Sequence, residues 1–158
     1  MYYVMSDLHG EYEKYREMLH KIRLSEEDTL FVLGDVVDRG GKPMEILLDM
    51  MERPNVYPIL GNHDFLALYL LRRLAVDITE ENSANHLTPE DMNDLLDWLG
   101  DGGTPTLSGF QKLSPEQRED VLSYLEEFSL YEVLDVGERT YILLHAGLGN
   151  FRPGRKLS

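Results

Sequence analysis

Residues 30–40 read Leu-Phe-Val-Leu-Gly-Asp-Val-Val-Asp-Arg-Gly, a short apolar run that passes directly into a polar cluster. The apolar part is nearly continuous rather than alternating, which is typical of a strand covered on both faces. Two further runs of strand length, residues 2–5 and 56–60, have the same character. Segments with apolar residues at helical spacing lie between the runs, over 12–22 and 43–51. The order strand, helix, strand, helix, strand predicts an α/β fold with a parallel sheet.

Residues 75–128 differ in character, and we interpret them as a helical insertion beside the sheet. A third helix, apolar on most sides and buried, is expected just before them, over about 64–74. Thr88 and Ser114 each stand before a proline and an acidic residue, as helix N-caps do. Two helical stripes are expected to be buried: Met92, Leu95, Leu96 and Leu99, and then Val121, Leu125 and Phe128.

The rest of this region contains turn signals and a run of acids. Residues 77–101 include eight acids and no Lys or Arg, which we interpret as a solvated face. Residues 101–103, Asp-Gly-Gly, break the chain between the two stripes. A hairpin is expected to follow, with strands over 130–136 and 140–145.

The composition limits both the chemistry and the partners. The chain has 158 residues, of which 42% are apolar, so one globular domain can bury a core. A formal net charge of −14 argues against nucleic acid and anionic lipid as partners, because both require a basic surface. The absence of cysteine excludes disulfides, thiolate nucleophiles and zinc–sulfur sites. No targeting signal or membrane-length apolar run is visible, so we expect a cytoplasmic protein with no membrane partner.

Each predicted strand runs directly into polar residues that can ligate metals. Asp7 and His9 follow the first strand, and Asp35 follows the second. Asn62 follows the third strand, and His145 ends the hairpin. Because ligands bind at the carboxyl ends of strands in open α/β sheets, we expect these loops to converge on one crevice. Carboxylates, imidazoles and an amide, without thiolate, suit divalent manganese, iron or zinc.

These clusters differ in how specific they are. Asp7 and His9 alone could be a helix cap and a surface histidine, and His-Ala-Gly over 145–147 is weak by itself. Gly-Asp-x-x-Asp-Arg-Gly over 34–40 is far more specific, because its five fixed identities arise by chance at roughly one in a million positions. Gly-Asn-His-Asp over 61–64 adds independent support. Together the clusters indicate a functional site rather than four ordinary turns.

In these motifs and in their order, the sequence resembles the bacterial phosphoprotein phosphatases, a branch of the calcineurin-like metallophosphoesterases. The resemblance covers about residues 1–147, and residues 98–107 also resemble the insertion of bacterial members. It implies an α/β metallophosphoesterase sandwich with a helical insertion. It also implies a serine/threonine phosphatase that hydrolyses phosphoproteins or small phosphomonoesters.

The resemblance further implies a site for two divalent metal ions, with manganese expected and iron or zinc as alternatives. Asp7 and His9 would bind the first ion, and Asp35 would bridge it to the second. Asn62 and His145 would bind the second ion. An anionic bridge offsets the repulsion of two cations ~3.5–4 Å apart, and such a pair lowers the pKa of a shared water. Attack by the resulting bridging hydroxide would hydrolyse the phosphoester.

Three residues receive catalytic roles from the same resemblance. His63, next to Asn62, would protonate the leaving oxygen. Asp38 would orient and stabilise that imidazole. Arg39 would offer a planar, charged fork to the phosphoryl oxygens, which Asn62 and His63 would also contact.

Some positions depart from the phosphatase pattern and leave an alternative open. Leu60 stands where protein phosphatases usually place a second phosphate-binding arginine, and Asp64 replaces the usual glutamate. Leu-Gly-Asn-His-Asp over 60–64 is instead similar to the symmetrical diadenosine tetraphosphatases. Asp38 is often lost in those enzymes, and the acidic insertion would repel a polyanionic dinucleotide. We therefore expect a phosphomonoesterase, with a symmetrical dinucleoside tetraphosphatase as the alternative.

A final histidine motif of the family has no counterpart in the sequence. Family members carry a Gly-His motif beyond His-Ala-Gly whose histidine completes the second metal site, and this sequence ends at Ser158 without one. We expect a single domain over 1–158 that lacks its C-terminal strands, either as a fragment or as a truncated, non-catalytic phosphate-binding module. The strand over 140–145 would then have an exposed edge that favours self-association.

Overall fold

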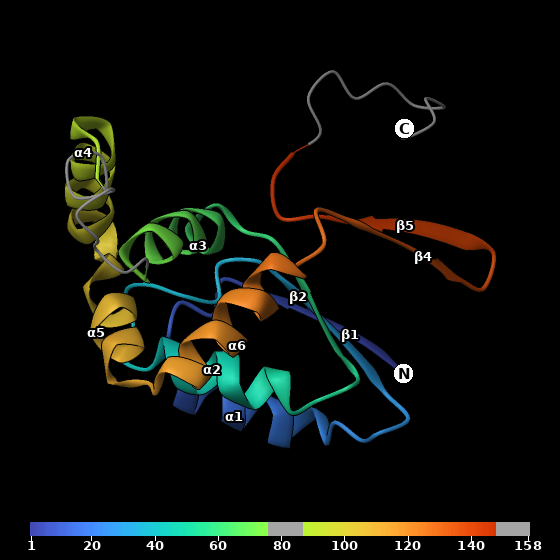
Figure 1. Ribbon diagram of the computed structural model, residues 1–158. Coiled ribbons are helices and arrows are strands. Elements are labelled where there is room, and N and C mark those ends of the chain that lie inside the picture. Colours follow the sequence, from blue (N-terminus) through green and yellow to red (C-terminus); the bar gives the residue numbers. More distant parts are fainter. Residues whose placement is uncertain (76–86, 148–158) are drawn as a thin grey trace.

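The computed structural model describes residues 1–75 and 87–147 of the chain. Its main sheet has three strands: β1 (Tyr2–Ser6), β2 (Thr29–Leu33) and β3 (Val56–Ile59), in that spatial order. Both pairings are parallel, with Tyr3 opposite Leu30 and Leu30 opposite Val56. The predicted parallel sheet is confirmed, and the carboxyl ends of its strands lie at one edge (Figure 1).

Three helices follow these strands: α1 (Tyr12–Ile22), α2 (Pro43–Met51) and α3 (Asn62–Ala75). Pro43 occupies the first turn of α2, where its missing N–H costs no hydrogen bond. α3 begins at Asn62 rather than near Asp64, so the Gly-Asn-His-Asp motif forms its first turn. The prediction that α3 is buried on most sides is wrong for one face, because Phe65 is 58% exposed and Tyr69 is 37% exposed. None of the described helices is long and apolar enough to cross a membrane.

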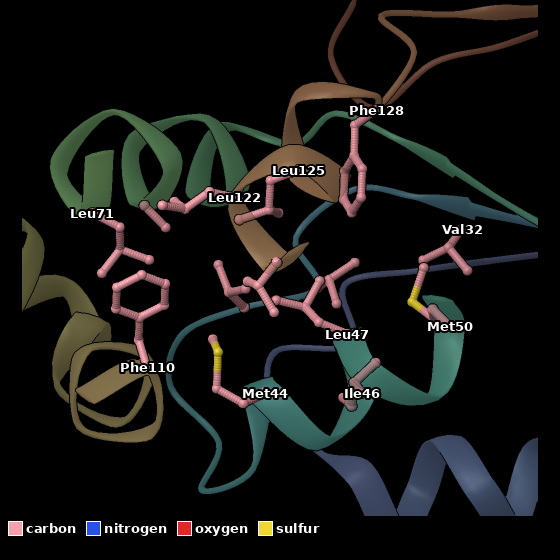
Figure 2. Close-up of a cluster of buried hydrophobic side chains, with 14 of the residues drawn as sticks. Val32, Met44, Ile46, Leu47, Met50, Leu71, Phe110, Leu122, Leu125 and Phe128 are labelled. Carbon is pink, nitrogen blue, oxygen red and sulfur yellow. The ribbon is translucent and has the colours of Figure 1, made fainter. Parts of the chain in front are cut away.

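A single cluster of buried apolar side chains joins β2 to the surrounding helices, and Figure 2 shows its part with α2, α3, α5 and α6. Leu30 and Val32 of β2 are completely buried on the helix-covered face of the sheet. Phe31 points to the opposite face, where its ring lies beside those of Tyr2 and Tyr57. On that face Phe31 itself is 7% exposed, but Tyr2 and Val4 are each 50% and Tyr57 is 47% exposed. The prediction of strands covered on both faces is therefore wrong for β1 and β3. Residues that meet β2 from the helices include Met44, Ile46, Leu47 and Met50 of α2, Leu71 of α3, Phe110 of α5 (Thr104–Lys112), and Leu122 and Leu125 of α6 (Pro115–Glu126).

The insertion region contains α5, α6 and, before them, α4 (Pro89–Trp98). Thr88 and Ser114 form complete capping boxes at the starts of α4 and α6, as predicted. The stripe of Val121, Leu125 and Phe128 is buried, which is also as predicted. Residues 76–86, which hold part of the acidic run, and residues 148–158 lie outside the described residues.

The predicted stripe of α4 is buried only in part, since Leu95 and Leu99 are half-buried against the core. Met92 and Leu96 are 43% and 63% exposed, whereas Asp91 and Trp98 are each 1% exposed. Asp91 is buried because it closes the capping box with Thr88 and accepts a hydrogen bond from the Tyr69 hydroxyl. Local hydrophobic spacing cannot show such partners, so it does not reveal that Asp91 and Trp98 are buried in place of Met92 and Leu96.

A second difference is that α5 was not predicted at all. The expected break over residues 101–103 is instead part of a five-residue π-helical turn, η1 (Leu99–Gly103), that joins α4 directly to α5. Gly102 bends the chain within it at φ +106°, a backbone conformation that glycine adopts readily. The turn brings α4 and α5 together beside the main sheet's strand ends, because Gly102 contacts Arg39.

The predicted hairpin is present with shorter strands, β4 (Glu132–Val136) and β5 (Arg139–Leu143). Within the described ranges these strands pair only with each other, and they project from the helical body (Figure 1). Apolar side chains are exposed on both faces, since Val133 is 52% and Tyr141 is 44% exposed. An isolated two-stranded hairpin is marginally stable in water. Self-association through its free edge stays a prediction.

Candidate active site

Backbone hydrogen bonds join the loop after β1 to the loop after β2. The His9 N–H donates to the Asp35 carbonyl at 2.9 Å, and the Gly40 N–H donates to the His9 carbonyl at 2.8 Å. A Cβ at Gly40 would overlap the His9 carbonyl oxygen, so this crossing requires glycine. The first and second predicted ligand loops are thus fixed against each other.

A buried carboxylate joins the second loop to the third. Asp64, in the first turn of α3, is completely buried and accepts N–H bonds from Asp35 at 2.8 Å and Gly61 at 3.0 Å on one oxygen. Its other oxygen accepts from Val36 at 2.9 Å and Val37 at 3.3 Å. Burial raises the pKa of Asp64 to about 6, while the bonds from Gly61, Val37 and Val36 lower it. Asp64 is therefore ionised at neutral pH and organises the loop that carries Asp35.

Five predicted site residues have backbone in the left-handed region: Asp7, His9, Asp35, Asp38 and Arg39, with φ between 41° and 70°. Such a conformation costs of order 1–3 kcal/mol per residue, and it persists only where the surroundings hold it. Among the other described residues that are not glycine, only Arg23 at the end of α1 shares it. The concentration of backbone strain marks this edge of the sheet as the candidate site.

The three predicted imidazoles are oriented in the same way. Nδ1 of His9 and Nδ1 of His145 donate to backbone carbonyls at 2.9 and 2.8 Å, and Nδ1 of His63 donates to the Asp38 carboxylate at 2.7 Å. A ring nitrogen that faces an oxygen acceptor carries the proton, so Nε2 of each neutral ring offers a lone pair. This is the form in which histidine binds a metal ion, with its other nitrogen anchored.

Asp35 lies between two of these histidines. Its Oδ2 is 3.6 Å from His9 Nε2, and its Oδ1 is 3.4 Å from His145 Nε2. The Oδ1 of Asn62 is 3.1 Å from the same His145 nitrogen. These are acceptor atoms that face one another, an arrangement that a cation between them stabilises. The donor set therefore fits divalent ions on both sides of Asp35, while the ligand assignment itself stays a prediction.

His63 and Asp7 occupy different positions around this centre. The atoms offered by His9, Asp35 and His63 all lie within 4.8 Å of one another, which places the predicted proton donor within reach of the same ion. Asp7 is not part of this set in the described chain. Its exposed side chain lines a cleft of about 260 Å³ with Lys14 and others. The assignment of Asp7 as a ligand stays a prediction.

Arg39 and His63 form the other side of the crevice. The Arg39 guanidinium donates to Nε2 of His9 at 2.8 Å and to Nε2 of His63 at 2.9 Å. Asp101 of η1 also faces this side, with its carboxylate 3.8 Å from Arg39 and 3.6 Å from His63 Nε2. The structure therefore brings the three predicted catalytic residues, His63, Asp38 and Arg39, together.

Sequence reasoning missed three residues that hold this arrangement: Asp64, Trp98 and Thr106. Trp98 Nε1 and Thr106 Oγ1 donate to the Asp38 carboxylate at 2.8 and 2.6 Å. For Asp64 the available signal was its place in the Gly-Asn-His-Asp motif, and for Trp98 and Thr106 it was the resemblance of residues 98–107 to the insertion of bacterial phosphatases. That likeness does not reveal which loop the segment reaches.

Parallel strands that end in carboxylate, imidazole, amide and guanidinium groups are typical of the metal-dependent phosphoesterases. The family model described as "Calcineurin-like phosphoesterase" matches residues 2–156, so the chain belongs to this family. The family implies divalent metal ions, for which His9, Asp35 and His63 form a candidate site. The predicted superfamily and fold are confirmed, whereas the narrower phosphoprotein phosphatase branch is not.

Two similar curated proteins carry the name "Bis(5'-nucleosyl)-tetraphosphatase, symmetrical". The protein of Nitrosospira multiformis is 34% identical over 99 residues, which cover 61% of this chain and 36% of its own length. The protein of Xylella fastidiosa is 31% identical over 150 residues, which cover 92% of this chain and 41% of its own length. The chain thus spans about two fifths of the length of these relatives.

A solved structure has a similar fold. The crystal structure of a candidate diadenosine tetraphosphatase superposes with a TM-score of 0.52 and 19% identity, covering 81% of this chain and 42% of the other. At this level of identity the similarity supports the fold alone.

Proposed function

We propose that the protein is a hydrolase that uses divalent metal ions and that its substrate is a dinucleoside tetraphosphate. The observation that carries the chemistry is Asp35, whose carboxylate oxygens face His9 on one side and His145 on the other. The names of the relatives support the substrate. The Leu-Gly-Asn-His-Asp motif over 60–64, which resembles that of the symmetrical tetraphosphatases, supports it as well.

The proposed metal ligands come from all four loops: Asp7 and His9, the shared Asp35, and Asn62 and His145. Manganese is the proposed ion, because oxygen and imidazole donors without thiolate suit it. When bound, the ions would activate water and neutralise charge on the phosphoryl oxygens. The Asp35 carboxylate, only 5% exposed, would offset the repulsion between them.

The remaining steps belong to side chains of the chain itself. His63, in its protonated form, delivers a proton from Nε2 to the leaving oxygen, while Asp38 holds Nδ1 and stabilises the positive ring. Arg39 is half-exposed and can turn its guanidinium from the two imidazoles to the phosphoryl oxygens. Asn62, at the first position of α3, would contact the same phosphoryl group.

A phosphomonoester, such as phosphoserine in a protein, is the second candidate substrate. The buried pair of Asp38 and His63 favours a phosphomonoester, because an alkoxide must be protonated to leave. A nucleotide anion is a better leaving group and depends less on such a proton. The Asp101 carboxylate near His63 also places negative charge beside the crevice, which disfavours a long polyanion.

Competing turnover measurements separate these candidates. With Mn²⁺, we expect a higher kcat/KM on diadenosine tetraphosphate than on a phosphoserine peptide, with two ADP molecules as products. A higher value on the peptide would replace the proposal with the second candidate. Chelator is expected to abolish turnover, and chelator-resistant turnover in metal-free buffer would contradict a metal-dependent mechanism. Phosphate binding without any turnover would favour a non-catalytic module.

A further inference from the structure

The Asp38 carboxylate is held by the insertion as well as by the catalytic histidine. It is completely buried, and three donors reach it: His63 Nδ1 at 2.7 Å, Trp98 Nε1 at 2.8 Å and Thr106 Oγ1 at 2.6 Å. Trp98 ends α4 and Thr106 lies in the first turn of α5, so two of the three donors come from the helical insertion. A buried carboxylate is costly without such partners.

Thr106 holds both the backbone and the side chain of Asp38. Its hydroxyl donates to Asp38 Oδ1 and accepts the Asp38 N–H at 2.9 Å. A hydroxyl has one proton and two lone pairs, so it makes both bonds at once. Asp38 has φ +70°, and this double contact helps to hold that strained conformation. The Gly102 carbonyl of η1 fixes the next residue by accepting the Arg39 N–H at 2.8 Å.

The same contacts determine how His63 is presented to the crevice. Trp98 and His63 donate to the same oxygen, Oδ2, so the indole N–H fixes the orientation of the carboxylate that His63 uses. The His63 ring is 4% exposed. If the carboxylate rotated, Nδ1 would lose its hydrogen-bond partner. The proton of the neutral ring could then move to Nε2, and the ring would no longer be held in one orientation.

We propose that Trp98 and Thr106 are positioning residues for the leaving-group acid. By holding Asp38 they keep the His63 Nδ1–H anchored, so that Nε2 is directed into the crevice and, in the protonated ring, carries the proton that is delivered to the leaving oxygen. Neither residue contacts His63 through a hydrogen bond of its own. The inference rests on the proposed role of His63 and not on the proposed dinucleotide substrate. It makes the helical insertion part of the chemistry.

Conservative variants test the donors one at a time. Thr106→Val removes a donor with little change in volume, and Trp98→Phe removes a donor together with part of the buried indole. In the Mn²⁺-loaded protein, each is expected to slow phenyl phosphate hydrolysis ~10-fold or more, as loss of an outer hydrogen-bond partner does. Hydrolysis of p-nitrophenyl phosphate should change less than ~2-fold, because nitrophenolate leaves with little need for a proton.

Two further variants serve as controls. Thr106→Ser keeps the hydroxyl and is expected to restore the wild-type ratio of the two rates. Thr104→Val makes the same chemical change at an exposed threonine of the same turn, and it should leave both rates unchanged. Equal slowing of both esters, or a Thr106→Ser variant no better than Thr106→Val, would overturn the inference.

A spectroscopic measurement tests the role of Trp98 and Thr106 without relying on turnover. Histidine ¹H–¹⁵N correlation spectra report which ring nitrogen of His63 carries the proton. We expect Nδ1–H in the wild type and a mixture of tautomers in the Trp98→Phe/Thr106→Val double variant, and an unchanged tautomer would reject the inference. If aryl phosphates are cleaved but diadenosine tetraphosphate is not, only the proposed substrate fails. If no phosphate ester is cleaved, the proposed hydrolase activity is rejected, and the His63 tautomer alone tests whether Trp98 and Thr106 position the ring.

Discussion

The crevice draws its residues from two regions that are held very differently. His9, Asp35 and His63 lie at the ends of a buried parallel sheet, in loops joined by backbone bonds and by the Asp64 carboxylate. His145 follows a two-stranded hairpin with apolar side chains exposed on both faces. Its described ties are a hydrogen bond from Nδ1 to the Leu33 carbonyl and the 3.1 Å approach of Nε2 to Asn62 Oδ1.

This difference separates the two sides of the proposed metal site. A ligand group must be held within about 0.5 Å to keep its geometry, which side chains on rigid elements achieve better than those on loops. The side with His9 is preorganised by the sheet core, whereas the side with His145 depends on a marginal element. We therefore expect the two sides to differ in metal affinity and in sensitivity to substitution.

The largest effect is expected at the residue that both sides share. Asp35→Asn removes the negative charge and replaces one of the two oxygens that face His9 and His145 with an NH₂ group, so both sides should weaken together. Turnover should fall by more than the ~100-fold that loss of an outer hydrogen-bond partner can cost. Steady-state kinetics with Mn²⁺ measure this loss. Asp120→Asn, the same change at an exposed carboxylate, is the control and should have no effect; comparable losses in both variants would contradict the assignment.

A smaller effect is expected when the support of the rigid side is weakened. Asp64→Asn replaces an acceptor oxygen with an NH₂ group that faces two N–H donors, and a buried unpaired donor costs about 1–3 kcal/mol. We expect the free energy of unfolding to fall by about 2–3 kcal/mol on that basis. Urea denaturation at pH 7 measures it, with Asp120→Asn again as the reference. A variant as stable as the wild type would show that Asp64 does not organise the loop.

Removing the hairpin histidine should affect one side only. His145→Ala is expected to weaken the binding of one Mn²⁺ ion by at least ~10-fold, in the range reported for disturbed metal sites, and to leave the other ion bound at His9 and Asp35. Titration calorimetry gives both affinities. His20→Ala, at an exposed histidine of α1, is the matched control. Loss of both ions in His145→Ala would show that the two sides are not independent.

The smallest effect is expected when the same substitution is made in each of the two sheets. Val32→Thr buries a hydroxyl in the completely buried β2 and should cost about 2 kcal/mol. Val133→Thr makes the same change on the exposed hairpin and should cost less than about 0.5 kcal/mol. Thermal unfolding of the two variants gives the difference. Equal costs would show that the hairpin is covered in solution.

The sequence predicted the structure accurately where the hydrophobic pattern and the chemically distinctive residues lie in the same short segment. The run over residues 30–40 contains both the buried strand and the loop with Asp35, Asp38 and Arg39, so one segment predicts the sheet and its functional edge. Helix starts are likewise marked by local features: Pro43 by its fixed backbone angle and missing N–H, and Ser114 by bonds made within a few residues. These features need no knowledge of distant partners.

The residues it missed act through partners that are distant in sequence. Asp64 binds N–H groups 27 to 29 residues earlier, and Thr106 reaches Asp38 across 68 residues. Trp98 was overlooked because its burial depends on Gly103 and Asp38 rather than on the spacing of its neighbours in α4. A carboxylate or an indole in one helix gives no local sign of which loop it will hold.

The hydrogen bonds that orient the three imidazoles constrain the evolution of the sequence to different degrees. His9 and His145 take their orientation from the carbonyls of Val37 and Leu33, and every amino acid supplies a carbonyl. The side chains at positions 33 and 37 therefore take no part in these hydrogen bonds, and Val37 is constrained by the core in which it is completely buried. His63 is oriented by the side chain of Asp38, which only one residue type provides in the same form. Of the three histidines, the proposed proton donor is the one whose hydrogen-bond partner a single side-chain substitution removes.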